Sequence, residues 1–210
     1  AKVAVHYFNS HDRAISVIVE KIRSGGEDAF SLQADFNSSQ AITDTIEQVT
    51  AYFGRLDILV NNAGSMVGRR KLEELDDQFV DHVFDLNARS VVTACHAVLP
   101  TFIHQGGGCI INVSSISART GGSPGSSIYS SAKAFVSTLT RSLARELADR
   151  KIRVNAISPG TIDTAFHEQF SSRGKLEKTR VEIPLQRLGD ASDCAGTALY
   201  LACDQLSGYV

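Results

Sequence analysis

Tyr129 and Lys133 are the residues of this sequence whose types and spacing most directly suggest chemistry. Four positions apart on a helix, they would lie on one face, about one turn from each other. A neighbouring ammonium group favours the ionised form of a phenol and so lowers its pKa. Such a Tyr could give a proton to a developing alkoxide or accept one from an alcohol. Taken alone, the pair is better interpreted as two solvated surface residues.

Small and polar residues gather in three loops, each directly after an apolar run that is typical of a strand. These loops are Asn61–Gly64, Ser114–Ser127 and Ser158–Thr164. In a doubly wound sheet, ligands bind beyond the carboxyl ends of the strands, and small residues let a ligand approach the backbone closely. The loops therefore predict a binding site at that edge, with a Ser hydroxyl beside the phenol of Tyr129.

The elements that must position these residues are short apolar strands alternating with longer amphipathic helices. This alternation favours a parallel sheet covered by helices on both faces. The expected strands are Lys2–Tyr7, Phe30–Ala34, Leu56–Val60, Cys109–Val113 and Ile152–Ile157. The helical patterns cover about residues 15–22, 42–53, 75–104, 130–149 and 191–202. Ser38 or Ser39 is the expected N-cap of the second helix. No repeat or linker indicates a second domain, so residues 1–210 are interpreted as one domain.

Composition excludes several classes of protein. The 210 residues carry 21 basic and 23 acidic side chains, a net charge of −2, without a basic stretch that would suit nucleic acid. No apolar run reaches the roughly 18 residues of a membrane span, and residues 1–5 do not resemble a signal peptide. The four cysteines form no CxxC pair and have no His at metal-ligand spacing. They predict reduced core thiols, no metal site and a cytoplasmic setting.

Five motifs in this order resemble the short-chain dehydrogenase/reductase family. They are Asn61-Asn62-Ala63-Gly64, Asn87 within Asp85-Leu86-Asn87-Ala88, Ile111-Asn112-Val113-Ser114-Ser115, Tyr129-Ser130-Ser131-Ala132-Lys133, and Asn155-Ala156-Ile157-Ser158-Pro159-Gly160 with Thr164. The resemblance is co-linear from Lys2 to the last residue and includes similarity to 3-oxoacyl-ACP reductase-like and glucose dehydrogenase-like members. It implies a Rossmann fold and an NAD(P)-dependent enzyme that interconverts a carbonyl and a secondary alcohol.

The resemblance also implies residue roles. Tyr129 would be the general acid and base, and Lys133 would lower its pKa and bind the nicotinamide ribose. Ser115 would stabilise charge on the substrate oxygen. Asn87 would interrupt its helix and hold a proton-relaying water. Cofactor contacts are implied for Tyr129, Lys133, Asn61, Ala63, Gly64, Pro159, Gly160, Ile162 and Thr164.

Cofactor choice depends on the end of the first strand. An NAD enzyme usually has a carboxylate there, and His6–Ser10 contains none. Tyr7, Asn9 and Ser10 could instead donate to a 2′-phosphate, so NADP is the preferred cofactor and NAD a possible one. Asn9–Ser10 could equally cap the next helix. Asp35 resembles the family residue that meets the adenine amino group, although capping of a helix is nearly as good an interpretation.

Three further features have weaker interpretations. His167 could border the substrate pocket, but a solvated helix face is favoured. Residues 69–71, which are Arg-Arg-Lys, could attract an anionic substrate, but a solvated loop is favoured. Residues 165–183 resemble the mobile substrate lid of the family, with Gly174 as a possible hinge.

Two departures from the family pattern bear on function. No Lys or Arg lies between Arg89 and Arg119, which counts against a 3-oxoacyl thioester substrate without removing it. The Gly-rich turn that follows the family's first strand is absent, and the chain stops before the family's last strand. We therefore expect a sequence that lacks its first βα unit and its last strand.

Alternative functions remain open. One is an NAD-linked sugar or polyol dehydrogenase, and another, from a different class, is a non-catalytic scaffold with the same fold. The substrate would be a small carbonyl or alcohol compound, with no nucleic acid and no membrane as partner. Family analogy implies a homodimer or homotetramer formed through the two long helices.

Overall fold

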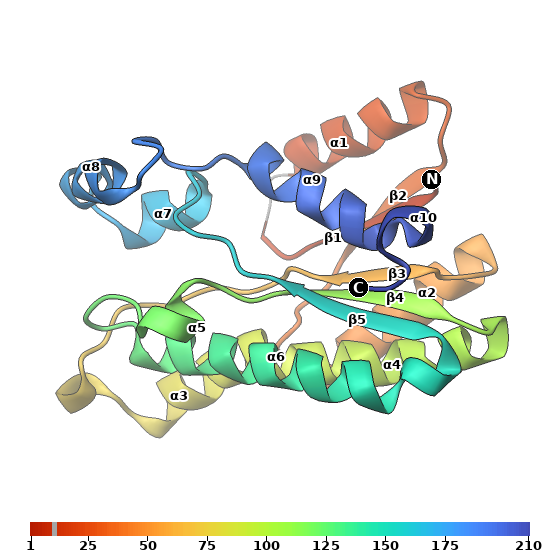
Figure 1. The fold of residues 1–210 in the computed structure, drawn as a ribbon, viewed down its shortest axis with the longest axis horizontal. Coiled ribbons are helices and arrows are strands. Elements are labelled where there is room, and N and C mark those ends of the chain that lie inside the picture. The colour runs from red at the N-terminus through yellow and green to blue at the C-terminus, as the bar shows by residue number, and fades with distance from the viewer. Residues whose placement is uncertain (10–11) are drawn as a thin grey trace.

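The computed structural model describes residues 1–9 and 12–210, with only the backbone described for residues 12 and 13. Helices lie on both sides of the parallel strands (Figure 1). Strand β1 (Val3–Tyr7) pairs with β2 (Ala29–Gln33). Strands β3 (Ile58–Asn61), β4 (Gly108–Val113) and β5 (Ile152–Ile157) pair in the order β3-β4-β5. All five expected strands and the parallel α/β arrangement are confirmed.

The strands form two sheets and not the single sheet that was expected. Among the described strands, β1 pairs only with β2, and β3 pairs only with β4. Ile58 and Val60, which share one face of β3, are 39% and 47% exposed, although residues of this kind belong in a covered sheet. The physical reason for the division is that no described backbone segment supplies hydrogen bonds between β1 and β3.

Helices cover the strands in two layers (Figure 1). One layer holds α2 (Ser39–Phe53), α3 (Asp77–Phe84), α4 (Ser90–Gln105) and α6 (Ser127–Glu146); the other holds α1 (Asp12–Ser24), α9 (Ala191–Ala202) and α10 (Asp204–Ser207). Ser38 is the N-cap of α2, and its hydroxyl accepts from the Ala41 N–H. The helix ends at Gly54, whose φ of 74° suits glycine. Short helical turns are η1 (Leu72–Glu74), α5 (Ser117–Thr120) and η3 (Ala148–Arg150).

The long helix expected over 75–104 is divided by a π-helical segment, η2 (Asp85–Arg89), between α3 and α4. Asn87 lies in this segment, is fully buried, and donates through Nδ2 to the carbonyls of Val83 at 2.8 Å and Ser65 at 2.7 Å. Its side chain thus occupies the Val83 carbonyl, the usual helical acceptor for its own backbone N–H. The helix break implied for Asn87 is therefore present, and it has this local cause.

The main apolar core lies between α4, α6 and the strands β4 and β5. Its fully buried members include Val98, Phe102, Ile110, Val136 and Ile152. Each such side chain contributes about 1.5–3 kcal/mol of apolar burial. Because α6 packs on this core, the helix that carries Tyr129 and Lys133 has a fixed position relative to β4 and β5.

A polar network crosses the same layer. Asn112 of β4 is fully buried; its Oδ1 accepts from Asn61 Nδ2 at 2.9 Å, and its Nδ2 donates to Thr140 Oγ1 of α6 at 2.9 Å. Asn61 Nδ2 also meets Cys95 Sγ at 3.4 Å. Since buried polar groups must be satisfied, the network fixes the position of β3, β4 and α6 relative to one another.

We expect Asn112→Ala to lower the free energy of unfolding by about 2–4 kcal/mol, because it opens a cavity and leaves buried polar groups without partners. Urea denaturation followed by circular dichroism measures the loss. Thr140→Val, which keeps the volume and removes only one bond of Asn112, should cost about 1 kcal/mol. A loss below 1 kcal/mol for Asn112→Ala would show that the network contributes little.

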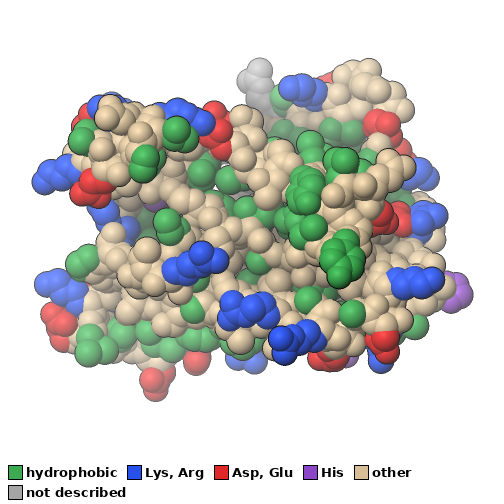
Figure 2. All heavy atoms as spheres, in the orientation of Figure 1, with side chains coloured by type: hydrophobic (Ala, Val, Ile, Leu, Met, Phe, Trp, Pro, Cys, Tyr) green, Lys and Arg blue, Asp and Glu red, His purple; other side chains and the backbone are tan. Residues whose placement is uncertain are grey.

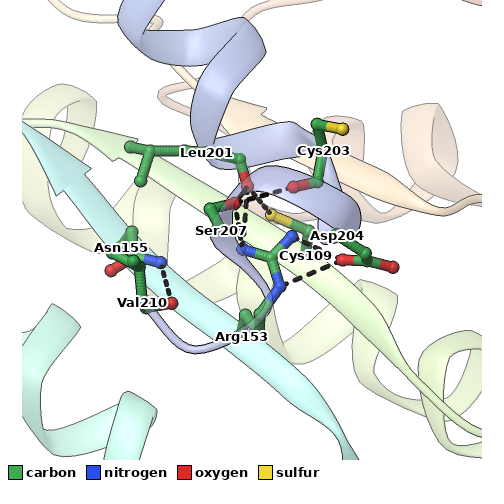
Figure 3. A network of polar contacts seen from close by, with 8 residues as sticks. All are labelled: Cys109, Arg153, Asn155, Leu201, Cys203, Asp204, Ser207 and Val210. Carbon is green, nitrogen blue, oxygen red and sulfur yellow. Dashed lines mark hydrogen bonds and ion pairs between the residues drawn. The ribbon is translucent and has the colours of Figure 1, made fainter.

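The C-terminal segment is held on β5 by Arg153 (Figure 3). Its guanidinium donates to the Leu201 carbonyl at 2.8 Å, to Ser207 Oγ at 3.2 Å and to Asp204 Oδ1 at 2.6 Å. Cys109 Sγ meets the same Leu201 carbonyl at 3.4 Å. These contacts fix α9 and α10 on the sheet, and α9 in turn supplies part of the cavity wall described below.

Two of the four cysteines, Cys95 and Cys109, are core thiols as expected, whereas Cys194 and Cys203 are half-buried. Burial raises the pKa of Cys95 to about 12. Within the described residues, no group of three or more His, Cys, Asp or Glu side chains could hold a metal ion. In that same part of the chain, none of the helices has the length and apolar character needed to span a membrane.

Candidate active site

A cavity of about 720 Å³ lies beyond the carboxyl ends of β3, β4 and β5. Its walls come from three regions: the segment after β4, the segment after β5, and the helices α7 (Ala165–Phe170) and α8 (Arg173–Glu182) with part of α9. Helices α7 and α8 project on one side of the molecule, and the surface is hollowed beneath them (Figures 1 and 2). The 165–183 segment expected to be a lid is thus two short helices over this cavity.

Tyr129 and Lys133 line the cavity from one face of α6, and not from a solvated surface. The Lys133 side chain is only 3% exposed, and its Nζ donates to the Val113 carbonyl at 2.9 Å. Nζ lies 5.8 Å from the centre of the Tyr129 ring. Burial lowers the pKa of Lys133 to about 8, because the low-dielectric surroundings disfavour its charged form.

The pKa of Tyr129 is raised above its ordinary value, and not lowered as its spacing from Lys133 predicts. Burial of the phenol is the larger influence, and the hydrogen bond with the Ser115 side chain opposes it. Burial outweighs the influence of the Lys133 ammonium, whose Nζ donates to the Val113 carbonyl and lies 5.8 Å from the ring centre. The phenol is consequently protonated at neutral pH, which is the form that can donate to a carbonyl oxygen.

Ser115 is oriented toward the phenol by the loop that follows β4. Its Oγ accepts from the Ser117 N–H at 3.2 Å and from the Ser117 hydroxyl at 3.0 Å. Before it, Ser114 Oγ donates to the Lys133 carbonyl at 2.9 Å and so ties the end of β4 to α6. The structure therefore brings Ser115, Tyr129 and Lys133 together at one cavity wall.

Gly64 lies where the loop after β3 meets Asn87 and Lys133. A Cβ at this position would be 2.7 Å from Asn87 Oδ1 and 3.2 Å from Lys133 Nζ. Asn87 Oδ1 also accepts from the Ser65 N–H at 3.2 Å. Only a residue without a side chain lets these three groups share the space, so Gly64 sets the position of two of the predicted catalytic residues.

We expect Gly64→Ala to lower kcat/KM by about 10²-fold, because the added methyl group displaces Asn87 or Lys133 from a tightly packed site. Steady-state kinetics with a reducible ketone gives the value. The matched control is Gly196→Ala in α9, where a Cβ meets nothing within 4 Å. Equal activity in the two variants would contradict the assignment of Gly64.

The other residues implied for cofactor contact divide into two groups. Gly160, Pro159, Ile162 and Thr164 line the cavity together with Gly64. Asn61 does not, because its side chain is in the core network with Asn112; its neighbour Asn62 lines the cavity instead.

A second cavity, of about 450 Å³, shares the lining residue Gly64 with the first. Its lining includes the predicted residues Tyr7, Asn9, Asp35 and Ala63. Ser10 lies outside the described residues. Asp35 accepts from the N–H of Asn37 at 2.9 Å and from its side-chain amide at 2.8 Å, whereas Ser38 caps α2. Asp35 therefore shapes the turn before the helix and lines the cavity as well.

Several lining residues had no motif to reveal them. Phe166 of α7 packs on Tyr129 with ring centroids 5.8 Å apart, and Lys175 of α8 and Cys194 of α9 complete the wall. Arg69 and His167 also line the cavity, although solvated positions were favoured for both. Spacing along the chain contains no signal for such contacts, because they join segments that are far apart in the sequence, such as Tyr129 and Phe166.

Comparisons with known proteins agree with this geometry. The family model described as enoyl-(acyl carrier protein) reductase matches residues 1–210. A 3-oxoacyl-[acyl-carrier-protein] reductase of Staphylococcus aureus is 39% identical over 207 residues, covering 97% of this chain and 81% of the relative. One from Synechocystis sp. is 37% identical over 213 residues, covering 100% of this chain and 82% of the relative.

Solved structures show the same likeness. An NADH-dependent reductase, A1-R′, responsible for alginate metabolism, superposes with a TM-score of 0.89 at 28% identity, covering 100% of this chain and 82% of that one. The same reductase complexed with NAD gives a TM-score of 0.85 at 28% identity, covering 100% and 81%.

Proposed function

Since the chain belongs to the short-chain dehydrogenase/reductase family, whose members are oxidoreductases that interconvert carbonyl and alcohol groups with NAD(P), we propose that Tyr129 is its general acid and base. The observation that carries this role is the half-buried Tyr129, whose phenol lies beside Ser115 and one helical turn from Lys133 at the wall of the larger cavity. This arrangement has the three groups that proton transfer to a carbonyl oxygen needs.

In the reduction direction, a nicotinamide cofactor, when bound, would supply the hydride that reduces the carbonyl carbon. Tyr129 gives its phenolic proton to the oxygen, and the Ser115 hydroxyl stabilises the negative charge that develops there. The phenolate left on Tyr129 is stabilised by the Lys133 ammonium, which is more effective in a buried site than in water. Asn87 fixes the loop at Ser65 beside Lys133 and would hold the water through which the phenol regains its proton.

The residues present fit the nicotinamide half and the adenosine half of a dinucleotide. The larger cavity contains the proton-transfer groups, the smaller one is lined by residues at the end of β1, and Gly64 lines both. Lys133, Gly160, Ile162 and Thr164 would hold the nicotinamide half, with Pro159 at the same wall. Asp35 would meet the adenine amino group, beside Asn37, whose buried Oδ1 has no partner within the described part of the chain.

NADPH is the proposed preferred cofactor. The side chains of Tyr7 and Asn9 can donate to a 2′-phosphate, and the described β1 residues that line the smaller cavity include no carboxylate. The structural relative A1-R′ is named as NADH-dependent, so the choice needs measurement. The ratio of kcat/KM for NADPH to that for NADH should exceed one; a ratio below one would overturn the preference.

The test of the function is oxidation of NADPH by the purified full chain in the presence of a panel of ketones, aldehydes and 3-oxoacyl thioesters. Turnover with at least one carbonyl compound is expected. If no compound is turned over and titration with NADPH shows no binding, the non-catalytic scaffold replaces the enzyme as the better interpretation. The 3-oxoacyl thioesters are included because the curated relatives carry that activity in their names; a sugar or polyol substrate with NAD is the other alternative.

Residues 1–210 would form one NAD(P)-binding domain that assembles as a homodimer or homotetramer. Val92 and Ile103 of α4 and Phe135 of α6 are exposed apolar side chains on the helices expected to pair. Light scattering should give two or four times the chain mass of 22.6 kDa. The free cysteines support a reducing compartment, the cytoplasm.

A further inference from the structure

The larger cavity has an unbalanced charge. Its basic lining residues are Arg69, Lys133, His167 and Lys175, and none of its described lining residues is Asp or Glu. The chain as a whole has a net charge of −2, so this concentration of positive groups is local. Lys133 belongs to the proton-transfer site, and the other three residues form a separate group, called here the cationic cluster (Arg69, His167 and Lys175).

Arg69 is held in place by backbone and not by a carboxylate. Its Nε donates to the Phe170 carbonyl at the end of α7 at 2.8 Å, and its Nη1 to the Pro124 carbonyl at 3.4 Å. Neither Arg69 nor Lys175 forms an ion pair with any residue in the described part of the chain. The nearby carboxylates Asp76 and Glu177 are paired with Arg70 and Arg180 instead.

The members of the cluster influence one another. The pKa of Lys175 is lowered by burial and by the charge of Arg69. The pKa of His167 is lowered by burial and by the charges of Arg69 and Lys175, with a smaller opposing influence from Asp163. The imidazole is therefore largely neutral at pH 7 and can still donate a hydrogen bond. Arg69 and Lys175 are half-buried like charges without an ion-pair partner among the described residues, which is unfavourable, and an anion between them would remove the repulsion.

The cluster lies one aromatic ring from the reacting phenol. Phe166 contacts the Tyr129 ring at 5.8 Å and the His167 ring at 5.3 Å, centroid to centroid. His167 Nδ1 is 3.1 Å from Ser171 Oγ, which adds another hydroxyl to the same wall. A substrate with its carbonyl at Tyr129 would thus place a group several bonds away beside the cluster.

We propose that the substrate carries an anionic group, a carboxylate or a phosphate, that binds between Arg69, His167 and Lys175 while its carbonyl lies at Tyr129. This inference deepens the proposed function and rests on it, because the substrate enters the same cavity. Guanidinium and ammonium groups bind either anion with charge-assisted hydrogen bonds. The apolar ring of Phe166 contacts the segment of the substrate between the two ends.

The experiment compares matched substrates that differ in charge. The acids 4-oxopentanoate and 5-oxohexanoate are assayed against their methyl esters, and dihydroxyacetone phosphate against dihydroxyacetone. We expect kcat/KM to be about ten- to a hundredfold higher for the charged member of at least one pair. The pair with the larger ratio identifies carboxylate or phosphate as the preferred anion.

Substitutions in the cationic cluster test whether its residues cause the preference for the charged substrate. Lys175→Gln and Arg69→Gln should reduce the charged-to-neutral ratio of kcat/KM about tenfold or more. Lys178→Gln is the matched control, because Lys178 is exposed on the same helix and does not line the cavity. Lys175→Gln is the more informative variant, since Arg69 also ties α7 to the loop at Pro124 and its loss could disturb folding.

Binding provides a readout that does not need turnover. The dissociation constants of 4-hydroxypentanoate and its methyl ester are measured by calorimetry for the full chain and for each variant. Tighter binding of the acid that is lost in Lys175→Gln, but kept in Lys178→Gln, supports the inference. If the neutral compounds react and bind as well as the acids, the anionic-substrate inference is overturned, and the oxidoreductase function is unaffected. If the acid still binds but no compound is turned over, the result counts against the proposed function alone.

Discussion

Replacing Tyr129 with Phe should lower kcat/KM for carbonyl reduction by about 10²- to 10⁴-fold, the usual contribution of a positioned general acid. The ring would keep its place against Phe166, so the loss comes from the missing proton donor and not from an altered pocket. Binding of NADPH, followed by the fluorescence of NADPH itself or by calorimetry, should change by less than about threefold, because the deleted hydroxyl acts mainly in the transition state.

Tyr200→Phe is the matched control for this change. Tyr200 lies on α9, is 41% exposed and does not line the larger cavity, so its variant should keep the full rate. If Tyr129→Phe retained more than about a tenth of the rate, general acid catalysis by this residue would be excluded. The ratio of the two variants therefore separates loss of the proton donor from a general effect of removing a phenolic hydroxyl.

The pKa of Tyr129 determines how the rate depends on pH. Because burial keeps the phenol protonated at neutral pH, reduction should proceed readily at pH 7. Oxidation of the alcohol requires the phenolate, so its rate should still be rising with pH at and above pH 9. An oxidation rate that levels off near pH 7 would indicate that the phenol ionises far below the range that this structure supports.

Lys133→Met should produce a protein that is more stable and much less active. The wild-type ammonium is buried at a cost, because its pKa falls from an ordinary 10.5 to about 8. By linkage this difference corresponds to about 3 kcal/mol at neutral pH. Loss of the hydrogen bond to the Val113 carbonyl removes about 1 kcal/mol. We therefore expect a net gain of about 2 kcal/mol in the free energy of unfolding, with kcat/KM lowered by about 10²-fold or more.

The pH dependence of this gain is the sharper test. The folded state has the depressed pKa, so below about pH 8 Lys133 is protonated in both states and the full destabilisation of the folded protein is present. Between about pH 8 and 10.5 the folded state holds fewer protons than the unfolded state, and wild-type stability rises relative to Lys133→Met. The difference between the two proteins, measured by urea denaturation, should shrink across this range.

Lys178→Met serves as the control for a lysine-to-methionine change in a helix. Lys178 is exposed, so its replacement should alter stability by less than about 0.5 kcal/mol at any pH. A Lys133→Met protein that is less stable than wild type at pH 7, or a difference that does not vary with pH, would contradict a costly buried ammonium. Comparing Lys133→Met with Lys178→Met also tests whether the lysine at position 133 lowers stability while it supports activity.

The arrangement of Tyr129 and Lys133 on one face of a helix follows from the sequence alone, because their separation of four residues is nearly one helical turn. The five strands and the polar loops after them are equally predictable, since strand–helix alternation requires parallel strands whose carboxyl ends lie on one side. Residue spacing was sufficient to predict a contact wherever the two residues are neighbours in the chain or lie at the ends of adjacent strands.

Tertiary structure decided what depends on burial and on distant segments. It raised the pKa of Tyr129, because the surroundings of the phenol, and not its neighbour Lys133, set the direction. It placed Asn61 in the core beside Asn112 and left an unpaired edge on β3. It also brought Arg69 within hydrogen-bond distance of Phe170, about 100 positions along the chain. Solvent exclusion and long-range contact arise only when separate elements pack, so residue spacing could not reveal them.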